Sequence, residues 1–355
     1  MIEKQQDTNK YSSKKISWFP EKLTALRDKR ITAPLYVRIK PTNRCNHKCP
    51  WCVYYEPELS NMGTDMNARD VIPREKLLRT LDELAELGVR AITYSGGGEP
   101  LLHPNIEEAM QKTLDLGMDL SIITHGQYLS GKKAEILAKS KWVRVSVDYH
   151  TPEMFSKTRR LSEKYFYVIM DNIKEFSKIK NKNCDLNVNY IITKENHDTL
   201  YDAAVLLKNA GVEIIRFAPV WNVTFYEYHA LIREKVMEQF ELMKDLEDEN
   251  FKIFSSYDID NVLIKRPYKR CYMMEVVPII GADLNIYPCH NQVYLNDSII
   301  CSFKDRSFKE AWFGEETRKM FETFDCQATC TNLCAADNKN LYIRELLNCE
   351  GDNFV

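Results

Sequence analysis

The feature that most constrains this sequence is an alternation of strand-like and helix-like segments, repeated six times between Ile31 and about Val220. Short apolar runs alternate with segments whose apolar residues recur every three or four positions, as on one helix face. This order implies parallel strands joined by right-handed crossovers. The sequence predicts an α/β fold, either a partial barrel of six units or an open doubly wound sheet. The predicted strands are Leu35–Ile39, Ala91–Tyr94, Leu120–Thr124, Val143–Val147, Leu186–Ile192 and Ile214–Ala218.

Three cysteines lie on the loop that leaves the first predicted strand: Cys45, Cys49 and Cys52, spaced C-x3-C-x2-C. An α/β barrel keeps its chemistry at this carboxyl edge of the strands. Cubane iron–sulfur clusters are held by cysteine thiolates, normally four to a cluster. Three ligands leave one iron open to a reacting molecule, as open catalytic metal sites do. A zinc knuckle is the alternative, although zinc sites favour paired C-x2-C groups plus a second pair.

The spacing, with the aromatic Trp51 before the last cysteine, resembles the radical S-adenosylmethionine (SAM) superfamily, whose signature is C-x3-C-x-aromatic-C. This resemblance implies that Cys45, Cys49 and Cys52 hold a [4Fe–4S] cluster with an open iron site that binds SAM. It also implies that electron transfer cleaves SAM to a 5′-deoxyadenosyl radical. The fold that it implies is a partial (β/α)6 barrel.

The same resemblance suggests a SAM pocket. Gly97-Gly98-Glu99 follows the second predicted strand and matches the family's GGE element, which implies backbone and carboxylate contacts to the SAM ammonium group. Phe217 is expected either beside the adenine or in the core. His125 stands where the family often has asparagine. The resemblance adds Trp51, Thr124, Ser146 and Arg159 to the cofactor-binding residues, with Ser146 and Arg159 near the SAM carboxylate and ribose.

A second concentration of cysteines lies in the last 85 residues, which hold seven of the eleven cysteines. A hairpin that turns at Gly281 can bring the C-x17-C pair together, and a C-x3-C-x3-C group follows. These thiols suffice for a second cluster and resemble the SPASM and twitch extensions that carry auxiliary clusters. A further cluster using Cys301 and Cys349, or a structural zinc, is an alternative. The predicted metal ligands are Cys271, Cys289, Cys326, Cys330 and Cys334, which implies at least one auxiliary [4Fe–4S] cluster.

The expected organisation is a tail and helix over 1–30, the barrel over 31–220, a helical connector over 221–270 and a cysteine-rich auxiliary-cluster domain over 271–355. The 49 basic and 51 acidic residues are balanced, which argues against a nucleic-acid partner or an anionic membrane. No window approaches 18 uninterrupted apolar residues, and the polar amino terminus lacks a signal pattern. The chain is therefore expected in the cytoplasm, where cysteines stay reduced.

The predicted activity is that of a radical SAM oxidoreductase that abstracts a hydrogen atom from a small polyhydroxylated or sugar-like substrate, leading to oxidation or epimerisation. The C-x17-C spacing resembles twitch-type dehydrogenases of aminocyclitol biosynthesis. The expected partners are a small-molecule substrate and a reductase such as flavodoxin or ferredoxin. The alternatives are a peptide maturase, of the RiPP or sulfatase-maturase type, and a zinc-stabilised binding protein. Arg38 and Arg216 are candidate substrate contacts or core ion-pair partners, and no catalytic residue is assigned.

Overall fold

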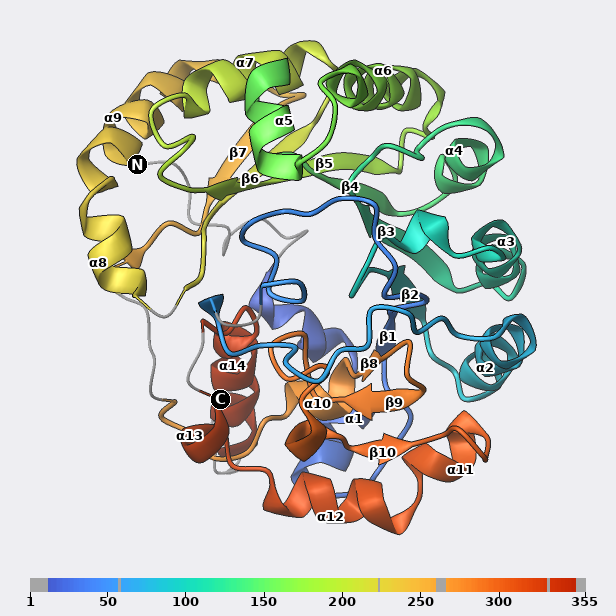
Figure 1. The fold of residues 1–355 in the computed structure, drawn as a ribbon. Helices are drawn as coiled ribbons and strands as arrows, with labels where there is room; N and C mark the ends of the chain where they lie inside the picture. Colours follow the sequence, from blue (N-terminus) through green and yellow to red (C-terminus); the bar gives the residue numbers. More distant parts are fainter. Residues whose placement is uncertain (1–11, 57–58, 223, 260–265, 331–332, 349–355) are drawn as a thin grey trace.

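A curved parallel sheet lies at the centre of the molecule. The structure, a computed structural model, describes residues 12–56, 59–222, 224–259, 266–330 and 333–348. Strands β1 to β7 are neighbours in chain order, and each of these pairs is parallel. Figure 1 shows that the sheet curves into an open arc with helices α2, α3, α4, α6 and α7 on its outer side.

The first six strands are the predicted ones, with bounds that differ by no more than one residue at either end. They confirm the predicted α/β partial barrel. The strands are β1 Tyr36–Ile39, β2 Ala91–Tyr94, β3 Asp119–Thr124, β4 Trp142–Ser146, β5 Asp185–Ile192 and β6 Ile214–Pro219. The helices between them are α2 Arg74–Glu86, α3 Ile106–Asp115, α4 Gly131–Leu137, α5 Pro152–Arg159, α6 Lys164–Ile179 and α7 Leu200–Asn209.

The helices cover the sheet with apolar faces, as α2 illustrates. Pro73 directly precedes this helix, where its missing N–H leaves no hydrogen bond unmade. Leu77, Leu81 and Leu84 recur at helical spacing, and all three are buried. Burial of each such side chain contributes about 1.5–3 kcal/mol to folding, which exceeds what helix propensity alone supplies.

The predicted helical connector over 221–270 contains a strand that the sequence pattern did not indicate. After α8 Phe225–Ala230 and α9 Arg233–Leu242, strand β7 Lys252–Ser255 pairs in parallel with β6. The expectation of helix alone over this segment is therefore corrected. Four residues are too few to show a period of two, and an acidic run directly precedes them.

The cysteine-rich end of the chain continues the same sheet. Strand β8 Ile279–Ile280 pairs in parallel with β1, and the predicted hairpin follows as the antiparallel pair of β8 and β9 Asn285–Tyr287. Strand β10 Cys301–Ser302 completes this edge. Main-chain hydrogen bonds therefore tie this region to the strand that precedes the first cysteine loop. The helices of this region are α10 Met273–Val276, α11 Phe308–Trp312, α12 Glu315–Thr323, α13 Cys326–Thr329 and α14 Asp337–Asn348.

Helix α14 lies on the open side of the arc (Figure 1). It packs against the 3₁₀ helix Ser13–Trp18 and against α1 Pro20–Arg27, near the other end of the chain. The hydroxyls of Ser17 and Tyr342 lie 2.8 Å apart across this contact. Among the described helices, none has the length and apolar content needed to cross a membrane.

Candidate functional site

The first cysteine loop leaves β1 at the carboxyl edge of the sheet and carries three thiols that form no disulfide. The N–H of Cys52 donates to the carbonyl of Cys49 at 3.1 Å, which closes a tight turn. Cys45 Sγ accepts a hydrogen bond from the N–H of His47 at 3.4 Å. All three cysteines are partly accessible. The loop therefore presents three reduced thiols close together, as the sequence pattern led us to expect.

Burial favours the protonated form of Cys45 and Cys52 in the absence of a cation. It raises the pKa of Cys45 to about 12 and also raises the pKa of Cys52. Metal-bound cysteines are thiolates, so metal binding releases their protons. The donor set, three cysteines on one loop, suits a cluster that keeps one iron open.

The glycine run after β2 lies against the cysteine loop. Gly98 N–H donates to the Thr42 carbonyl at 3.2 Å, and Glu99 N–H donates to the Arg44 carbonyl at 2.9 Å. A Cβ on Gly98 would stand 2.1 Å from the Arg44 carbonyl oxygen, and one on Gly97 would meet Asn43 Oδ1 at 2.3 Å. Glycine is therefore required for close approach of the two loops, a reason that the sequence alone did not provide.

The Glu99 carboxylate joins the ends of β2 and β3. It is buried, and it accepts hydrogen bonds from Thr124 Oγ1 at 2.6 Å, from His125 N–H at 2.8 Å and from Leu101 N–H at 3.0 Å. Burial raises its pKa to about 7, and the three donors oppose that rise. Glu99 and Thr124 thus position the loop ends, whereas their predicted contacts to SAM stay predictions.

Arg159, at the end of α5, contacts the cysteine loop directly. Its guanidinium donates to Cys49 Sγ at 2.7 Å, to the Ser146 carbonyl at 3.0 Å and to Asp148 Oδ2 at 2.6 Å. The Trp51 ring lies 6.0 Å from the guanidinium carbon. The charge of Arg159 therefore acts on a predicted cluster ligand. Its predicted place near the SAM carboxylate and ribose remains a prediction.

Two further aromatic positions differ in their surroundings. Trp51 is half-buried beside Arg159. Phe217 is fully buried and packs against Tyr190 and Phe240 on the helix side of β6. Of the two interpretations left open for Phe217, the structure supports core packing.

A stacked histidine pair supports the cysteine loop from β3. The rings of His47 and His125 lie 3.7 Å apart and within 2° of parallel. His47 Nε2 donates to Gln127 Oε1 at 2.9 Å, and His125 Nε2 donates to Asn46 Oδ1 at 2.9 Å. Burial lowers the pKa of His47 to about 2 and that of His125 to about 3, so both rings are neutral. This pair was not predicted, because its members are far apart in sequence.

Tyr294 connects the cysteine-rich region to the first loop. Its hydroxyl donates to Asn43 Oδ1 and accepts from the N–H of Ala282 at 3.1 Å. A Cβ atom on Gly97 would stand 2.9 Å from Cε2 of the Tyr294 ring, which is too close for a side chain. Nothing in the local sequence marked Tyr294, which acquires its position through the pairing of β8 with β1.

The second thiol group draws cysteines from several segments of the chain. Hydrogen bonding with Cys326 lowers the pKa of Cys271 to about 7 and also lowers that of Cys330. Cys289 lies within the electrostatic reach of Cys271, Cys334 and Cys330, although burial is the main cause that raises its pKa. The structure thus brings together all five thiols predicted for the auxiliary site.

The other cysteines fall outside this group. Cys301 is buried, and its thiol hydrogen-bonds with Thr317. Cys184 is fully buried, and its Sγ lies 3.5 Å from the Ser140 hydroxyl. Cys349 lies outside the described residues. A further cluster built with Cys301 is therefore not supported by this arrangement.

In the described part of the chain, no three His, Cys, Asp or Glu side chains are placed to hold a single metal ion. Zinc–sulfur bonds of about 2.3 Å require sulfurs about 3.8 Å apart around a tetrahedral ion. A cubane is larger and separates its ligands more widely. Both thiol groups consist of cysteines alone, which is the donor set that holds iron–sulfur clusters.

The concave surface of the sheet, called the inner face below, is not filled by apolar side chains. In β1 and β4 the residues that point towards the helices are buried, and the alternate residues are partly accessible. The same alternation continues at the ends of β5 and β6. Partial access on this side leaves room for a ligand. Its partly accessible residues are Tyr36, Arg38, Ile123, Arg144, Ser146, Asn189, Ile191, Arg216 and Ala218.

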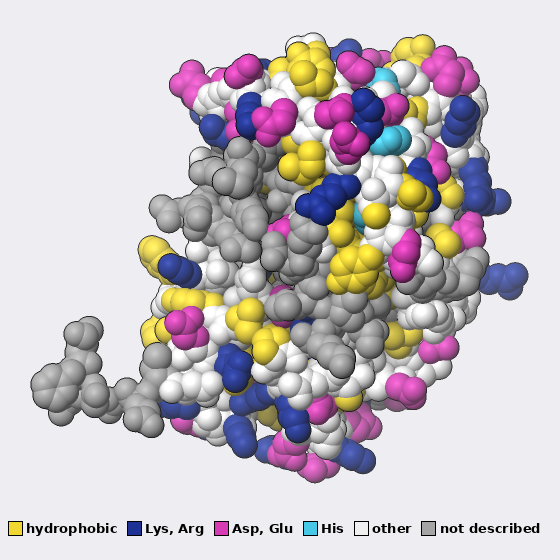
Figure 2. Space-filling model, turned by 90° about the vertical axis from the view of Figure 1, so that its left-hand side faces the viewer, with side chains coloured by type: hydrophobic (Ala, Val, Ile, Leu, Met, Phe, Trp, Pro, Cys, Tyr) yellow, Lys and Arg dark blue, Asp and Glu magenta, His cyan; other side chains and the backbone are white. Residues whose placement is uncertain are grey.

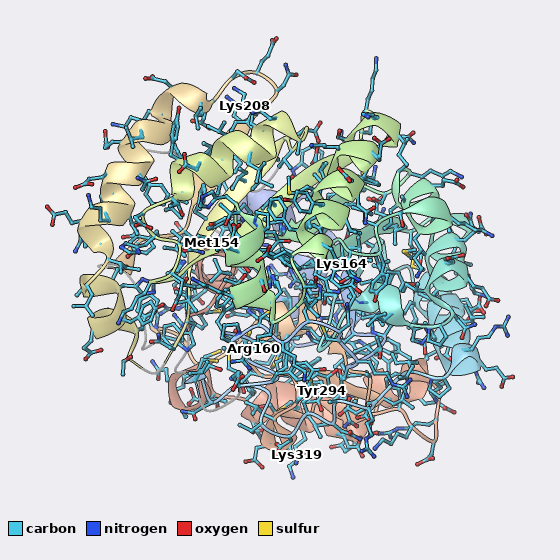
Figure 3. The ribbon with its side chains drawn as sticks, turned by 45° about the horizontal axis from the view of Figure 1, so that its top comes forward. Met154, Arg160, Lys164, Lys208, Tyr294 and Lys319 are labelled. Carbon is cyan, nitrogen blue, oxygen red and sulfur yellow. The ribbon has the colours of Figure 1, made fainter. Side chains whose placement is uncertain are left out.

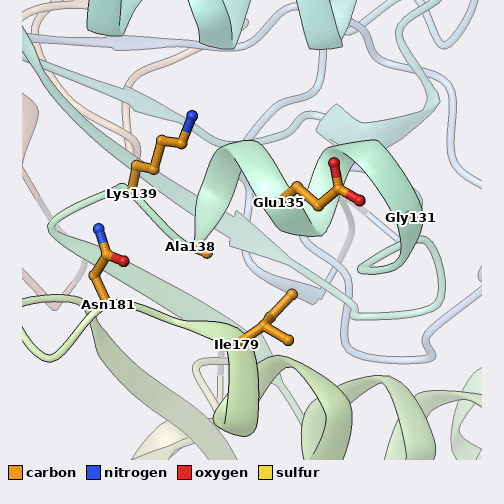
Figure 4. Close-up of a pocket in the computed structure, with 6 residues that line it drawn as sticks. All are labelled: Gly131, Glu135, Ala138, Lys139, Ile179 and Asn181. Atoms are coloured by element: carbon orange, nitrogen blue, oxygen red, sulfur yellow. The ribbon is translucent and has the colours of Figure 1, made fainter.

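A separate pocket lies in the outer helical layer, between α4 and the end of α6 (Figure 4). None of the residues that line it belongs to either thiol group or to the inner face. It therefore has no part in the site described above. Its lining residues are Gly131, Glu135, Ala138, Lys139, Ile179 and Asn181.

Comparison with known proteins gives a family match for residues 39–207, to the model described as the radical SAM superfamily. GTP 3′,8-cyclase of Limosilactobacillus fermentum is 31% identical over 193 residues, which are 53% of this chain and 55% of that protein. The chain thus matches only about half the length of that relative. PqqA peptide cyclase of Granulibacter bethesdensis is 26% identical over 305 residues, 80% of this chain and 75% of that protein.

Among solved structures, Streptococcus suis SuiB bound to precursor peptide SuiA is similar in fold, with a TM-score of 0.63 and 17% identity. The similarity covers 86% of this chain and 70% of SuiB. It therefore extends beyond the barrel strands into the cysteine-rich end.

Proposed function

Because this chain belongs to the radical SAM superfamily, we propose that it is an enzyme that modifies a peptide through a 5′-deoxyadenosyl radical. The observation that carries the radical chemistry is the loop of Cys45, Cys49 and Cys52, held by hydrogen bonds against Gly98 and Glu99. Such a loop provides three thiolates for a cubane. The iron without a thiolate would stay open to a ligand beside the backbone of the glycine run.

Each residue of the site has a proposed task. Cys45, Cys49 and Cys52 hold a [4Fe–4S] cluster, and Arg159 stabilises the charge on Cys49. The backbone of Gly97 and Gly98 contacts the SAM amino acid group. When bound, the cluster and SAM together supply a radical that removes a hydrogen atom from an unactivated C–H bond. Glu99, Thr124, Ser146 and Trp51 complete the cofactor-binding residues.

The second thiol group is proposed to hold an auxiliary [4Fe–4S] cluster. Its five candidates exceed the four thiolates that a closed cubane needs. Cys271, Cys289, Cys330 and Cys334 are the proposed four, and Cys326 is the alternate ligand because its thiol bridges Cys271 and Cys330. A complete shell provides a redox centre without an open iron, suited to take up an electron during an oxidation.

The peptide proposal replaces the small polyhydroxylated substrate as first choice. The supporting observation is that the match to PqqA peptide cyclase covers 80% of this chain, including its cysteine-rich end. The sugar-like alternative rests on the C-x17-C spacing, which any auxiliary-cluster hairpin of this length would show. The peptide proposal and the sugar-like alternative share the same cluster sites, and both need a reductase such as flavodoxin or ferredoxin.

The test uses anaerobically prepared protein, reduced in the presence of SAM. We expect 5′-deoxyadenosine, with about eight irons and eight sulfides per chain for two cubanes. A colourless protein with zinc and no acid-labile sulfide would overturn the radical proposal in favour of a binding protein.

The substrate class is tested with a deuterium-labelled cell extract separated into peptide and small-metabolite fractions. Deuterium in 5′-deoxyadenosine from the peptide fraction supports peptide modification. Deuterium transfer from the small-metabolite fraction alone overturns the peptide proposal and favours a sugar-like substrate.

A further inference from the structure

Positive charge is concentrated on one part of the inner face. Arg38 in β1 and Arg216 in β6 are partly accessible residues of this surface. Lys40 follows directly after β1 and is buried, and its Nζ donates to the Gly96 carbonyl at 2.6 Å and to the Tyr54 hydroxyl at 3.0 Å. The cations therefore lie between the first cysteine loop and the opposite strand of the arc.

Helix α14 adds a lysine to this group from the open side of the arc. Burial, together with the charges of Arg38, Arg216 and Lys15, lowers the pKa of Lys339 to about 8. The Lys339 side chain is nevertheless exposed. Lys339 therefore lies on α14, on the open side of the arc, within electrostatic reach of Arg38 and Arg216.

Three of these cations have no acidic partner within the described residues. Neither Arg38, Lys40 nor Lys339 forms an ion pair with an aspartate or glutamate there. The only protein partner of the Arg38 guanidinium in this part of the chain is the Tyr36 hydroxyl, which accepts from Nε. Within the described residues, the two terminal nitrogens of Arg38 thus have no hydrogen-bond partner.

The outer surface provides the contrast. On the face shown in Figure 2, acidic and basic side chains are interspersed, as the 49 basic and 51 acidic residues suggest. A cationic inner face is thus a local arrangement and not a consequence of overall charge. SAM carries a net positive charge and would not offset it.

We propose that the inner face binds an anionic group of the substrate, a carboxylate or a phosphate, through Arg38 and Lys339. The inference rests on the proposed function and specifies its substrate. On a peptide the anionic group is an acidic side chain near the modified residue. Arg38 suits it because two guanidinium nitrogens can donate to one carboxylate or phosphate.

A competing role for Arg38 is to balance the charge of the auxiliary cluster, since Cys289 is among the groups that raise the Arg38 pKa. That role predicts a shifted cluster potential in Arg38→Gln without any change in anion affinity. Lys339→Gln provides a second variant, because an exposed side chain can be replaced without disturbing the fold.

The experiment measures binding of triglutamate, tripolyphosphate and trilysine to the reconstituted, SAM-bound enzyme by calorimetry. We expect one or both anions to bind and trilysine not to bind. Arg38→Gln and Lys339→Gln should each weaken anion binding about tenfold. Lys319→Gln, an exposed lysine at the periphery on α12 (Figure 3), should leave it unchanged. Preference for triglutamate indicates a carboxylate, and preference for tripolyphosphate indicates a phosphate.

The proposal is overturned if trilysine binds as well as the anions, if no anion binds, or if Lys319→Gln weakens binding as much as Lys339→Gln. Reductive cleavage of SAM without substrate is measured in the same samples. If cleavage persists while anion binding is absent, only the anionic substrate is rejected. If cleavage is also absent from the wild-type enzyme, the proposed function itself fails.

Discussion

The two thiol groups of this molecule are built in opposite ways. In the first, three cysteines occupy one short loop, and Cys49 and Cys45 each have a partner that is not a thiol: Arg159 and the His47 backbone. In the second, the thiols interact with one another, and Cys326 bridges Cys271 and Cys330.

This difference separates an open site from a closed one. A loop of three thiolates beside a backbone surface leaves room for a molecule that reacts, whereas five thiols that face each other surround what they bind. The first group should therefore control SAM chemistry, and the second should control electron storage and stability.

The largest expected effect distinguishes these roles directly. Cys49→Ala should abolish 5′-deoxyadenosine formation, by about a thousandfold or more, because three thiolates are the minimum for the open cluster. Cys330→Ala should retain SAM cleavage while substrate turnover falls. Product and iron analysis of both variants checks this, with Cys184→Ala as the control because that buried thiol belongs to neither group. Equal loss of cleavage in both variants would remove the distinction.

The second effect is on folding. Cys271→Ala should lower the free energy of unfolding by about 4 kcal/mol or more, since it removes a proposed cluster ligand that would tie the start of α10 to α13. Cys45→Ala should lower the free energy of unfolding by less, because the proposed ligands of the first cluster all lie on one loop. Anaerobic thermal unfolding of the cluster-loaded proteins measures this. Equal destabilisation would mean that both clusters support the fold alike.

The third effect concerns the charge beside the first loop. Arg159→Gln removes a positive charge that stabilises the reduced cluster, so the midpoint potential should fall by about 60 mV for every 1.4 kcal/mol of lost interaction. The matched control is Arg160→Gln, the next residue, whose side chain is half exposed and pairs with Glu56 (Figure 3). A potential titration followed by electron paramagnetic resonance gives the values. An unchanged potential in Arg159→Gln would show that Arg159 only supports the loop.

The smallest effect is a pH dependence on the inner face. The pKa of Lys339 is lowered to about 8, so its charge is present below that pH and is lost as the pH rises through it. Anion affinity should therefore fall severalfold between pH 7 and pH 9, and Lys339→Gln should flatten this slope. Binding titrations at several pH values test it. Lys40, with a pKa lowered to about 7, would retain a weaker dependence. Affinity that rises with pH contradicts the assignment.

Particular residues show how far the sequence could lead. Cys45, Cys49, Cys52 and the later Gly97-Gly98-Glu99 were visible because each set lies within one short stretch that follows a recognisable strand. Tyr294 and the His47–His125 pair were invisible, since each depends on partners distant in the chain. The reason for glycine at Gly98 was also hidden, because the obstructing atom belongs to Arg44.

The sequence by itself determined the alternation of strands and helices and the placement of three cysteines at one strand end, because these depend on near neighbours and on a fixed period. Only the tertiary structure decided which cysteines at the far end of the chain meet, and which cations gather on the inner face. Those arrangements depend on the curvature of the sheet and on the pairing of β8 with β1, which bring together residues that no local pattern connects.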